Sequence, residues 1–268
     1  DPTLPSQDIQ KQAAQAHQNF RRMLEDHHIH VTCFQGQMDC PDDLFCNNWV
    51  STYADKTYDL YPLLASNRRL ERRRDIINFL KQSYQVDQDL TAYEEEGKFL
   101  ESTGSIVLDR VHQIAYAAVS PRTDADLFNQ WCAHKGYEPV LFEAYDEQGK
   151  AEYHTNVILS IGTEVAVTCA ESISEHQRKR VLEKLSQTRD IIDISCAQRN
   201  NFCGNILEVR SWDEKKLFLI MSSRAYNCYT PGQRQRFRLY YDKILHTDIE
   251  TIETYGGGSA RCMMLELF

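Results

Sequence analysis

Three residues far apart in the sequence, Cys262, His154 and Glu101, have the side chains best suited to covalent chemistry. Cys262 ends the segment GGGSARC, where the glycines let the backbone approach a ligand closely. The amides of Gly257 and Gly258 are therefore candidate donors to a developing negative charge. Cysteine with histidine is a recurrent pair for covalent catalysis, in which imidazole moves protons for the nucleophile and the leaving group.

Glu101 adds a carboxylate, which binds the planar N–H groups of a guanidinium or a urea in a bidentate manner. Each of the three residues also has a structural alternative: an exposed acid, a surface histidine and a buried core cysteine. Asn48, Asn156 and Asn205 are further loop residues that either line a polar pocket or serve as turn residues. Arg224 ends an apolar strand and either binds a substrate carboxylate or is a strand-end charge.

Five segments have the 3.6-residue spacing of apolar positions that predicts amphipathic helices, beginning at residues 7, 66, 124, 174 and 231. Ser66, Asp124, Ser174 and Thr230 are the expected caps of four of them, and Pro231 suits a first helical position. A short strand is expected after each helix, beginning at residues 29, 84, 138, 190 and 248. A polar loop and a more apolar strand follow in each case.

The polar loops recur at nearly equal intervals. Asn48, Glu101, His154, Asn205 and Cys262 mark the five loops, about 50 residues apart, a period typical of repeat architectures. A unit of this size must share a core with its neighbours, and five units closing into a ring bring their loops to one end of the axis. The sequence therefore predicts a single α/β domain over 1–268, a five-bladed propeller with one shared site.

One strand is lacking from this pattern. Units two to four have two strands after the loop, whereas only MMLELF follows Cys262. The two prolines in DPTLPSQ disfavour a strand at the start of the sequence. We therefore expect an N-terminal strand that this sequence does not contain.

Composition narrows the function classes. The formal charge of −9 argues against a general nucleic-acid surface, and the basic run RRLERRR is expected to be the solvated face of a helix. The longest apolar runs are too short to span a membrane. Nine cysteines without a CxxC pair indicate neither a zinc site nor a disulfide framework, so we expect a cytoplasmic protein. The histidines of HHIH follow a helix end and are not expected to bind metal.

Seven segments in order resemble the guanidino-group-modifying, or pentein, superfamily: PDDLFCNNWVST, ESTGSIVLDR, AYAAVSPRTD, YHTNVILSIGTEVAVTC, NNFCGNILEV, MSSRAY and GGGSARCMMLELF. The superfamily includes arginine and agmatine deiminases, dimethylarginine hydrolases and amidinotransferases, and the chain looks most like its citrulline-utilisation hydrolase branch. The resemblance implies a propeller that begins with a strand. It also implies Cys262 as nucleophile, His154 as general acid and base, and Glu101 as the carboxylate that holds substrate nitrogen, with no cofactor.

Two departures from the arginine deiminase pattern bear on the substrate. Asn48 replaces an aspartate, and His154-Thr155-Asn156 replaces a His-x-Asp element. Each change removes an anionic acceptor, which a guanidinium would lose as a charge-assisted contact of about 1.5 to 3 kcal/mol. An amide both donates and accepts, so it suits a neutral ureido group better. We therefore expect hydrolysis of citrulline to ornithine, ammonia and carbon dioxide.

Two alternatives to this function stay open at this point. The first is deiminase-like or amidinotransfer chemistry on a guanidino substrate, with the same thiolate. The second is an inactive pentein that serves as a scaffold or binding protein. The expected partner is a small amino-acid substrate rather than nucleic acid or membrane, and the expected assembly is a homodimer.

Overall fold

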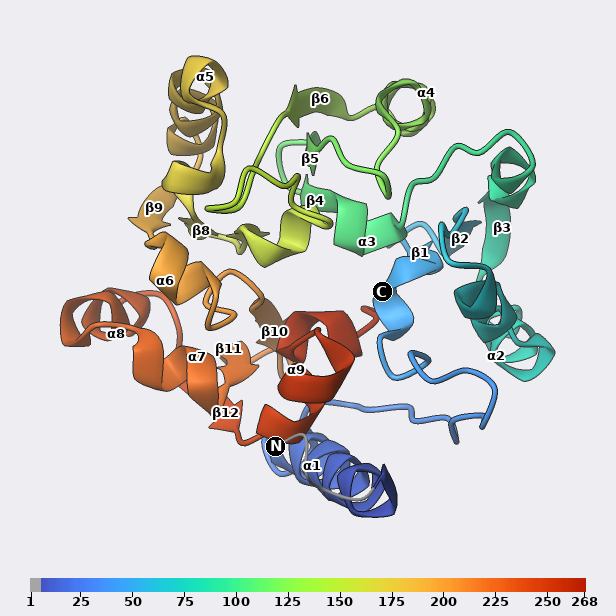
Figure 1. Cartoon of the computed structure of the whole chain (residues 1–268). Helices are drawn as coiled ribbons and strands as arrows, with labels where there is room; N and C mark the ends of the chain where they lie inside the picture. The colour runs from blue at the N-terminus through green and yellow to red at the C-terminus, as the bar shows by residue number, and fades with distance from the viewer. Residues whose placement is uncertain (1–5) are drawn as a thin grey trace.

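The computed structural model describes residues 6–268, and its twelve strands form four three-stranded sheets (Figure 1). The strands are β1 (Val50–Thr52), β2 (Thr57–Leu60), β3 (Gln85–Asp89), β4 (Ile106–Asp109), β5 (Ile114–Ala118), β6 (Glu138–Phe142), β7 (Leu159–Ile161), β8 (Val165–Thr168), β9 (Asp190–Asp193), β10 (Leu207–Arg210), β11 (Leu217–Ser222) and β12 (Lys243–Thr247). In each sheet the first two strands are antiparallel and the third is parallel to the second. The predicted repeat is therefore confirmed in four units.

The helices of the described residues fall into two classes, longer helices between strands and single turns at strand ends. The α-helices are α1 (Ser6–Glu25), α2 (Arg74–Leu80), α3 (Ser102–Ser105), α4 (Ala125–Lys135), α5 (Glu175–Ser186), α6 (Cys196–Arg199), α7 (Ser223–Cys228), α8 (Pro231–Phe237) and α9 (Glu250–Gly256). The 3-10 turns are η1 (Cys46–Asn48), η2 (Ser66–Glu71), η3 (Thr91–Glu94), η4 (Thr155–Val157), η5 (Ala170–Ser172) and η6 (Ala260–Met263). Between residues 6 and 268, no helix has the length and apolarity needed to cross a membrane.

A parallel pair of strands needs a crossover connection, and α2, α4, α5 and α8 lie in the crossovers of the four sheets. Figure 1 shows the four sheets arranged around a centre, with the single turns α3, η1 and η6 near it and the longer helices outside. The central strand of a sheet is covered on both faces: every residue of β5 and β8 is buried. The ring core thus explains why these strands are apolar throughout rather than alternating.

The fifth unit has helices but, within the described residues, no sheet. Helix α1 packs Phe20 and Leu24 against Ile249 and Ile252 of the α9 region. The predicted strand at residue 29 is not formed, although the adjacent His28 O accepts from Trp212 N at 2.8 Å. The segment after Cys262 is also outside any strand.

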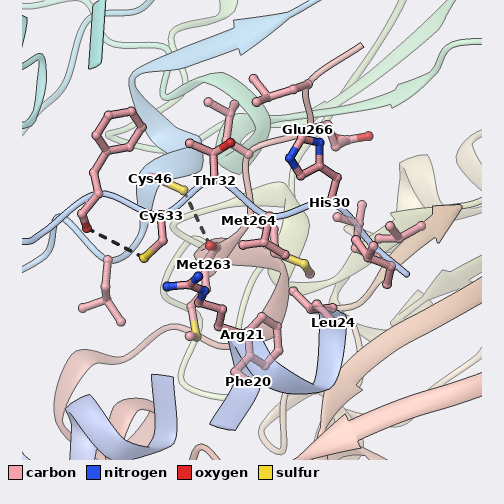
Figure 2. Close-up of a pocket in the computed structure, with 18 of the residues that line it drawn as sticks. Phe20, Arg21, Leu24, His30, Thr32, Cys33, Cys46, Met263, Met264 and Glu266 are labelled. Atoms are coloured by element: carbon pink, nitrogen blue, oxygen red, sulfur yellow. Dashed lines mark hydrogen bonds between the residues drawn. The ribbon is translucent and has the colours of Figure 1, made fainter. Parts of the chain in front are cut away.

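A groove separates these two strand-like segments. The pocket between them has a volume of about 1250 Å³. Figure 2 shows His30, Thr32, Met264 and Glu266 among the residues that line it. The segment after Cys262 is held beside β1, since Thr52 Oγ1 donates to Glu266 O at 2.7 Å.

One predicted strand, at the end of the fourth unit, is wrong. Helix α8 begins at Pro231 as predicted and ends at Phe237, but the segment from residue 248, predicted as a strand, contains helix α9. Two features of α9 oppose the strand interpretation: Asp248 Oδ1 accepts from Glu250 N at 2.9 Å, and acidic residues in the first turn favour the helix dipole.

Among the predicted caps, two make the expected contact. Asp124 accepts from Leu127 N, and Thr230 accepts from Gln233 N in a capping box. Ser174 precedes α5, but its hydroxyl is paired with the ring of His176 instead. Ser66 is the first residue of η2, so it lies inside the turn rather than before it.

Candidate active site

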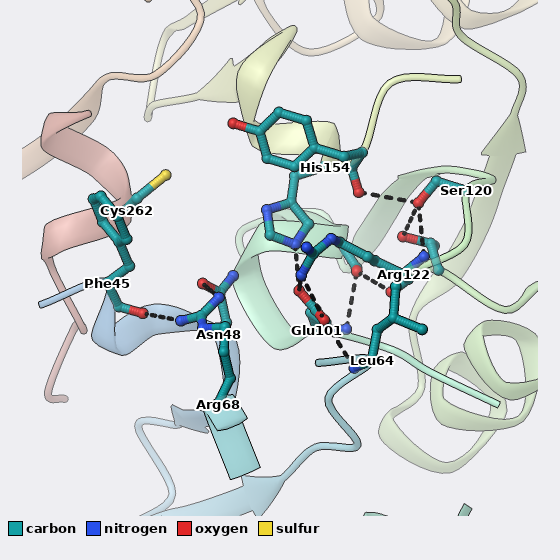
Figure 3. Close-up of polar contacts among 12 residues, drawn as sticks. Phe45, Asn48, Leu64, Arg68, Glu101, Ser120, Arg122, His154 and Cys262 are labelled. Atoms are coloured by element: carbon teal, nitrogen blue, oxygen red, sulfur yellow. Dashed lines mark hydrogen bonds and ion pairs between the residues drawn. The ribbon is translucent and has the colours of Figure 1, made fainter. Parts of the chain in front are cut away.

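The three chemically suited residues stand on single helical turns at the ends of strands. Glu101 immediately precedes α3, His154 precedes η4, and Cys262 lies within η6. All three are almost inaccessible to solvent, with 0%, 4% and 4% of their surfaces exposed. In Figure 3, His154 and Glu101 are in contact, and Cys262 lies across from them beyond Asn48.

The carboxylate of Glu101 is surrounded by hydrogen-bond donors. Oε2 is 2.7 Å from His154 Nε2, Arg122 Nη1 donates to both oxygens at 3.0 and 3.1 Å, and Leu64 N donates to Oε1 at 3.0 Å. Burial by itself raises the pKa of Glu101, but the bond and charge of His154, followed by the charge of Arg122, lower it to about 2. Glu101 is therefore ionised at neutral pH.

The imidazole of His154 is held in one orientation. Burial lowers its pKa below the usual value, more than the Glu101 carboxylate raises it, so the ring is neutral at neutral pH. A neutral ring that donates from Nε2 to Glu101 keeps its lone pair on Nδ1. Gly104 leaves the space that this edge of the ring needs, because an added Cβ would lie 3.1 Å from Nδ1.

The sulfur of Cys262 is contacted by neutral amides. Asn205 Nδ2 donates to Sγ at 3.2 Å, and Asn156 Nδ2 lies 3.9 Å from the same atom. The orientation of Asn205 is fixed because its Oδ1 accepts from the backbone N–H groups of Arg261 and Cys262, at 3.1 and 3.3 Å. Asn156 is fixed in turn by donating to Thr103 O at 3.1 Å.

Asn48 presents a nitrogen rather than an oxygen toward His154. Its Oδ1 accepts from Arg68 Nη1 at 2.9 Å, and Arg68 is paired with Glu71 at 2.7 Å. Because a guanidinium only donates, this contact fixes the amide and turns Nδ2 away from Arg68. Nδ2 is buried without a partner, and an added Cβ on Gly104 would lie 2.3 Å from it.

The two candidate glycines differ in what their backbone offers. Gly257 ends α9 with φ of 71°, and its N–H already donates to Glu253 O at 3.2 Å. That amide is thus engaged in the helix end rather than directed at a substrate. An added Cβ on Gly258 would be 2.7 Å from the ring of Phe45, so the glycine is required for packing.

Arg224 lies on the exposed surface at the start of α7. Its Nε donates to Asn201 Oδ1 at 3.2 Å, and its guanidinium lies 5.9 Å from the centroid of Phe202. The hydrogen bond of Arg224 is thus to Asn201 and not to Glu101, His154 or Cys262.

Sequence reasoning missed Arg122, Arg68 and Tyr153, each of which contacts a predicted site residue. The expectation that RRLERRR is a solvated helix face is wrong for Arg68 and Glu71, which are 6% and 2% exposed. Arg68 and Glu71 are three residues apart, a spacing that pairs opposite charges on one helical turn and was the available signal. Arg122 pairs with a residue 21 positions away, for which periodicity gives no signal.

The sequence model of the family described as N,N dimethylarginine dimethylhydrolase, eukaryotic, matches residues 2–268. The chain belongs to this family. It is thus a member of the pentein superfamily, whose enzymes act on guanidino groups, and its family is one of hydrolases of guanidino C–N bonds. No curated protein matches the chain.

Solved structures show the same fold at low identity. The N-terminal domain of ArgZ, an arginine dihydrolase from the ornithine-ammonia cycle in cyanobacteria, was solved as a cysteine-to-serine variant bound to substrate. It is 17% identical with a TM-score of 0.74, over 96% of this chain and 86% of that one. Unliganded AgrE is 20% identical with a TM-score of 0.75, over 95% of this chain and 34% of AgrE.

A dimethylarginine dimethylaminohydrolase bound as an adduct to 4-chloro-2-hydroxymethylpyridine is also similar. It is 17% identical with a TM-score of 0.69, over 96% of this chain and 91% of that one. These likenesses agree with an α/β pentein fold built here from four three-stranded sheets.

Proposed function

We propose that this family member hydrolyses a C–N bond of a ureido or guanidino amino acid through a covalent thioester-like intermediate on Cys262. The contact of 2.7 Å between His154 and the ionised Glu101 supports this role, since it prepares a buried imidazole to accept and return a proton. The Asn205 contact to Sγ supports Cys262 as nucleophile, because an N–H donor stabilises a thiolate.

In the proposed reaction, Sγ of Cys262 bonds to the central carbon of the substrate while the thiol proton passes through His154 to the departing amine. The C–N bond breaks with its electron pair on nitrogen. Water then loses a proton to His154 and attacks the same carbon, and the C–S bond breaks to return the thiol. Glu101 stabilises the imidazolium that forms in both steps.

For the substrate itself we propose a neutral ureido group, most simply citrulline. Asn48 supports this choice because Arg68 occupies its oxygen, which leaves an N–H donor beside His154. A guanidinium has only donors, whereas a ureido group has a carbonyl oxygen that accepts from such an N–H. The described steps release R–NH₂ and carbamic acid, H₂N–COOH, which decomposes to carbon dioxide and ammonia. The balanced overall reaction is therefore R–NH–CO–NH₂ with one water giving R–NH₂, carbon dioxide and ammonia.

The match to the dimethylarginine family favours a second candidate function. In that reaction the same thiol attacks a dimethylated guanidino carbon, and dimethylamine leaves while a ureido amino acid is released. Both candidates use Cys262, His154 and Glu101 in the same roles. Arg224, Gly258 and Asn156 remain our proposed contacts to substrate, with Arg224 assigned to the carboxylate.

A substrate panel tests the choice between these functions. Citrulline, arginine and N,N-dimethylarginine are each incubated with the wild-type protein and with Asn48→Asp, and ammonia and dimethylamine are measured. We expect wild-type activity on citrulline, and about a 10- to 100-fold relative gain for the guanidino substrates in Asn48→Asp, since a carboxylate replaces a neutral amide.

Cys262→Ala is the control for covalent catalysis in this panel and should lose activity on the order of 10³-fold or more. The second candidate would be favoured if the wild-type protein released dimethylamine from N,N-dimethylarginine but no ammonia from citrulline. Full activity of Cys262→Ala on every substrate would contradict both.

A further inference from the structure

Tyr153 connects the loop of His154 with the loop of Cys262. Its phenol donates to Gly257 O at 3.0 Å, joining residues 104 positions apart. Its ring lies against the neighbouring His154, with centroids 4.9 Å apart and planes tilted by 51°. Its own carbonyl accepts from Ser120 Oγ at 3.0 Å, which fixes the backbone from which the ring projects.

The pKa of the Tyr153 phenol lies above its usual value. Burial raises the pKa of Tyr153, and a nearby negative charge on Cys262 is the next largest cause. The hydroxyl therefore stays protonated at neutral pH and remains a donor to Gly257 O. Tyr153 thus contacts both sides of the proposed site, the imidazole side through its ring and the nucleophile side through its hydroxyl.

The glycine loop, residues 256–258, packs against a second aromatic ring, that of Phe45. An added Cβ on Gly256 would lie 2.9 Å from the Phe45 ring, and one on Gly258 would lie 2.7 Å from it. Phe45 is itself buried, with 5% of its surface exposed. The backbone of Gly256 and Gly258 thus packs directly on Phe45, while the carbonyl of Gly257 between them is bound by Tyr153.

Exposure shows which residue a substrate meets first. Glu101, His154 and Cys262 are 0%, 4% and 4% exposed, whereas Tyr153 retains 37%. An amino-acid substrate is much larger than these residual openings. We propose that Tyr153 is a positioning residue whose hydrogen bond to Gly257 holds the nucleophile loop closed over Cys262 and His154, and that this bond breaks to admit the substrate. The inference rests on the proposed function only for the identity of the nucleophile.

Tyr153→Phe removes the hydroxyl and keeps the ring, so it tests the bond alone. The rate of Cys262 alkylation by iodoacetamide at neutral pH, followed by peptide mass, should rise about 2- to 10-fold, the factor of one neutral hydrogen bond. In the same variant, kcat should fall by a similar factor because the nucleophile is less firmly positioned. The pH profile should not change, because the phenol does not titrate in the working range.

Two controls accompany this variant. Tyr145→Phe changes another partly exposed tyrosine, 40% exposed, and should alter neither rate. Cys33 is exposed in the same chain, and its alkylation serves as an internal reference for reagent activity. Unchanged Cys262 alkylation together with unchanged kcat in Tyr153→Phe would overturn the inference. Suppose that Cys262 is alkylated faster in Tyr153→Phe, but Cys262→Ala keeps its hydrolase activity. That result would support the inference about Tyr153 and contradict the proposed function.

Discussion

The two sides of the site are held by different kinds of interaction. On one side, Glu101 combines an arginine, an imidazole and a backbone amide in a buried ionic group. On the other side, the Cys262 sulfur is contacted by two neutral amides, at 3.2 and 3.9 Å. Buried charges require paired, well-ordered partners, whereas sulfur forms weaker and looser contacts.

This difference indicates a division of labour between the two sides. In the proposed reaction, the ionic side fixes the imidazole that transfers protons. The neutral side holds the sulfur that bonds to carbon, and the partners of that sulfur are the side-chain amides of Asn205 and Asn156. Loss of the Glu101 charge itself should therefore reduce activity more than loss of a neutral partner of the sulfur.

The largest effect is expected for Glu101→Gln. The amide keeps an acceptor for His154 but cannot stabilise an imidazolium by charge, so kcat should fall about 10²- to 10⁴-fold. The matched control is Glu94→Gln, since Glu94 also binds an arginine, Arg72 at 2.6 Å, and a backbone amide, that of Leu63 at 2.8 Å. Both variants should lower the melting temperature, but only Glu101→Gln should lower kcat. If both variants lost the same factor in kcat, the effect of Glu101→Gln would come from a less stable fold and not from a role of Glu101 in proton transfer.

An intermediate effect is expected for Asn205→Ala. Without its N–H the sulfur loses its shortest described contact, and kcat should fall about 10- to 100-fold as one bond to a developing anion is lost. Alkylation of Cys262 at neutral pH should slow as well. Asn200→Ala, whose amide donates to the exposed Glu147, is the control. A kcat loss larger than that of Glu101→Gln would reverse the comparison between the two sides.

The smallest effect is expected for Arg122→Met, and it should depend on pH. The charge of Arg122 lowers the pKa of both Glu101 and His154, so its removal raises both. Activity requires ionised Glu101 and neutral His154, and the acid limb of kcat/KM should therefore move to higher pH. We expect a loss of about 3- to 10-fold near neutral pH, which diminishes as the pH rises. An acid limb that moves to lower pH would contradict the role given to the charge of Arg122.

Much of this arrangement follows from the order of residues in the chain, because strand and helix periods are local properties. The loop spacing predicts five equivalent units, of which four form sheets of the same topology, and it places Glu101 and His154 in equivalent loops. It fails at α9, where the isoleucines and threonines of DIETIETY resemble a strand but the first turn of the segment is acidic. It also fails at residue 29, where a strand needs a neighbour that periodicity cannot supply.

The site residues are less predictable than the fold because side-chain direction depends on distant partners. Neither the bond from Asn205 to Cys262 nor the one from Arg68 to Asn48 follows from spacing, since each joins segments from different units. Arg68 is the clearest case. It belongs to a basic run, yet the backbone carbonyl of Phe45 and the carboxylate of Glu71 hold it in the interior.

The equivalent placement of Asn48, Glu101, His154, Asn205 and Cys262, one in each repeating unit, has a consequence for divergence among relatives. A single codon change in one unit replaces one of five groups around the reacting atoms while the other four keep their supporting backbone. New substrate preferences can thus be acquired stepwise, without rebuilding the scaffold. Two pairs are the exception, since Glu101 binds His154 and Asn205 binds Cys262, so a change in one member of either pair also affects the other.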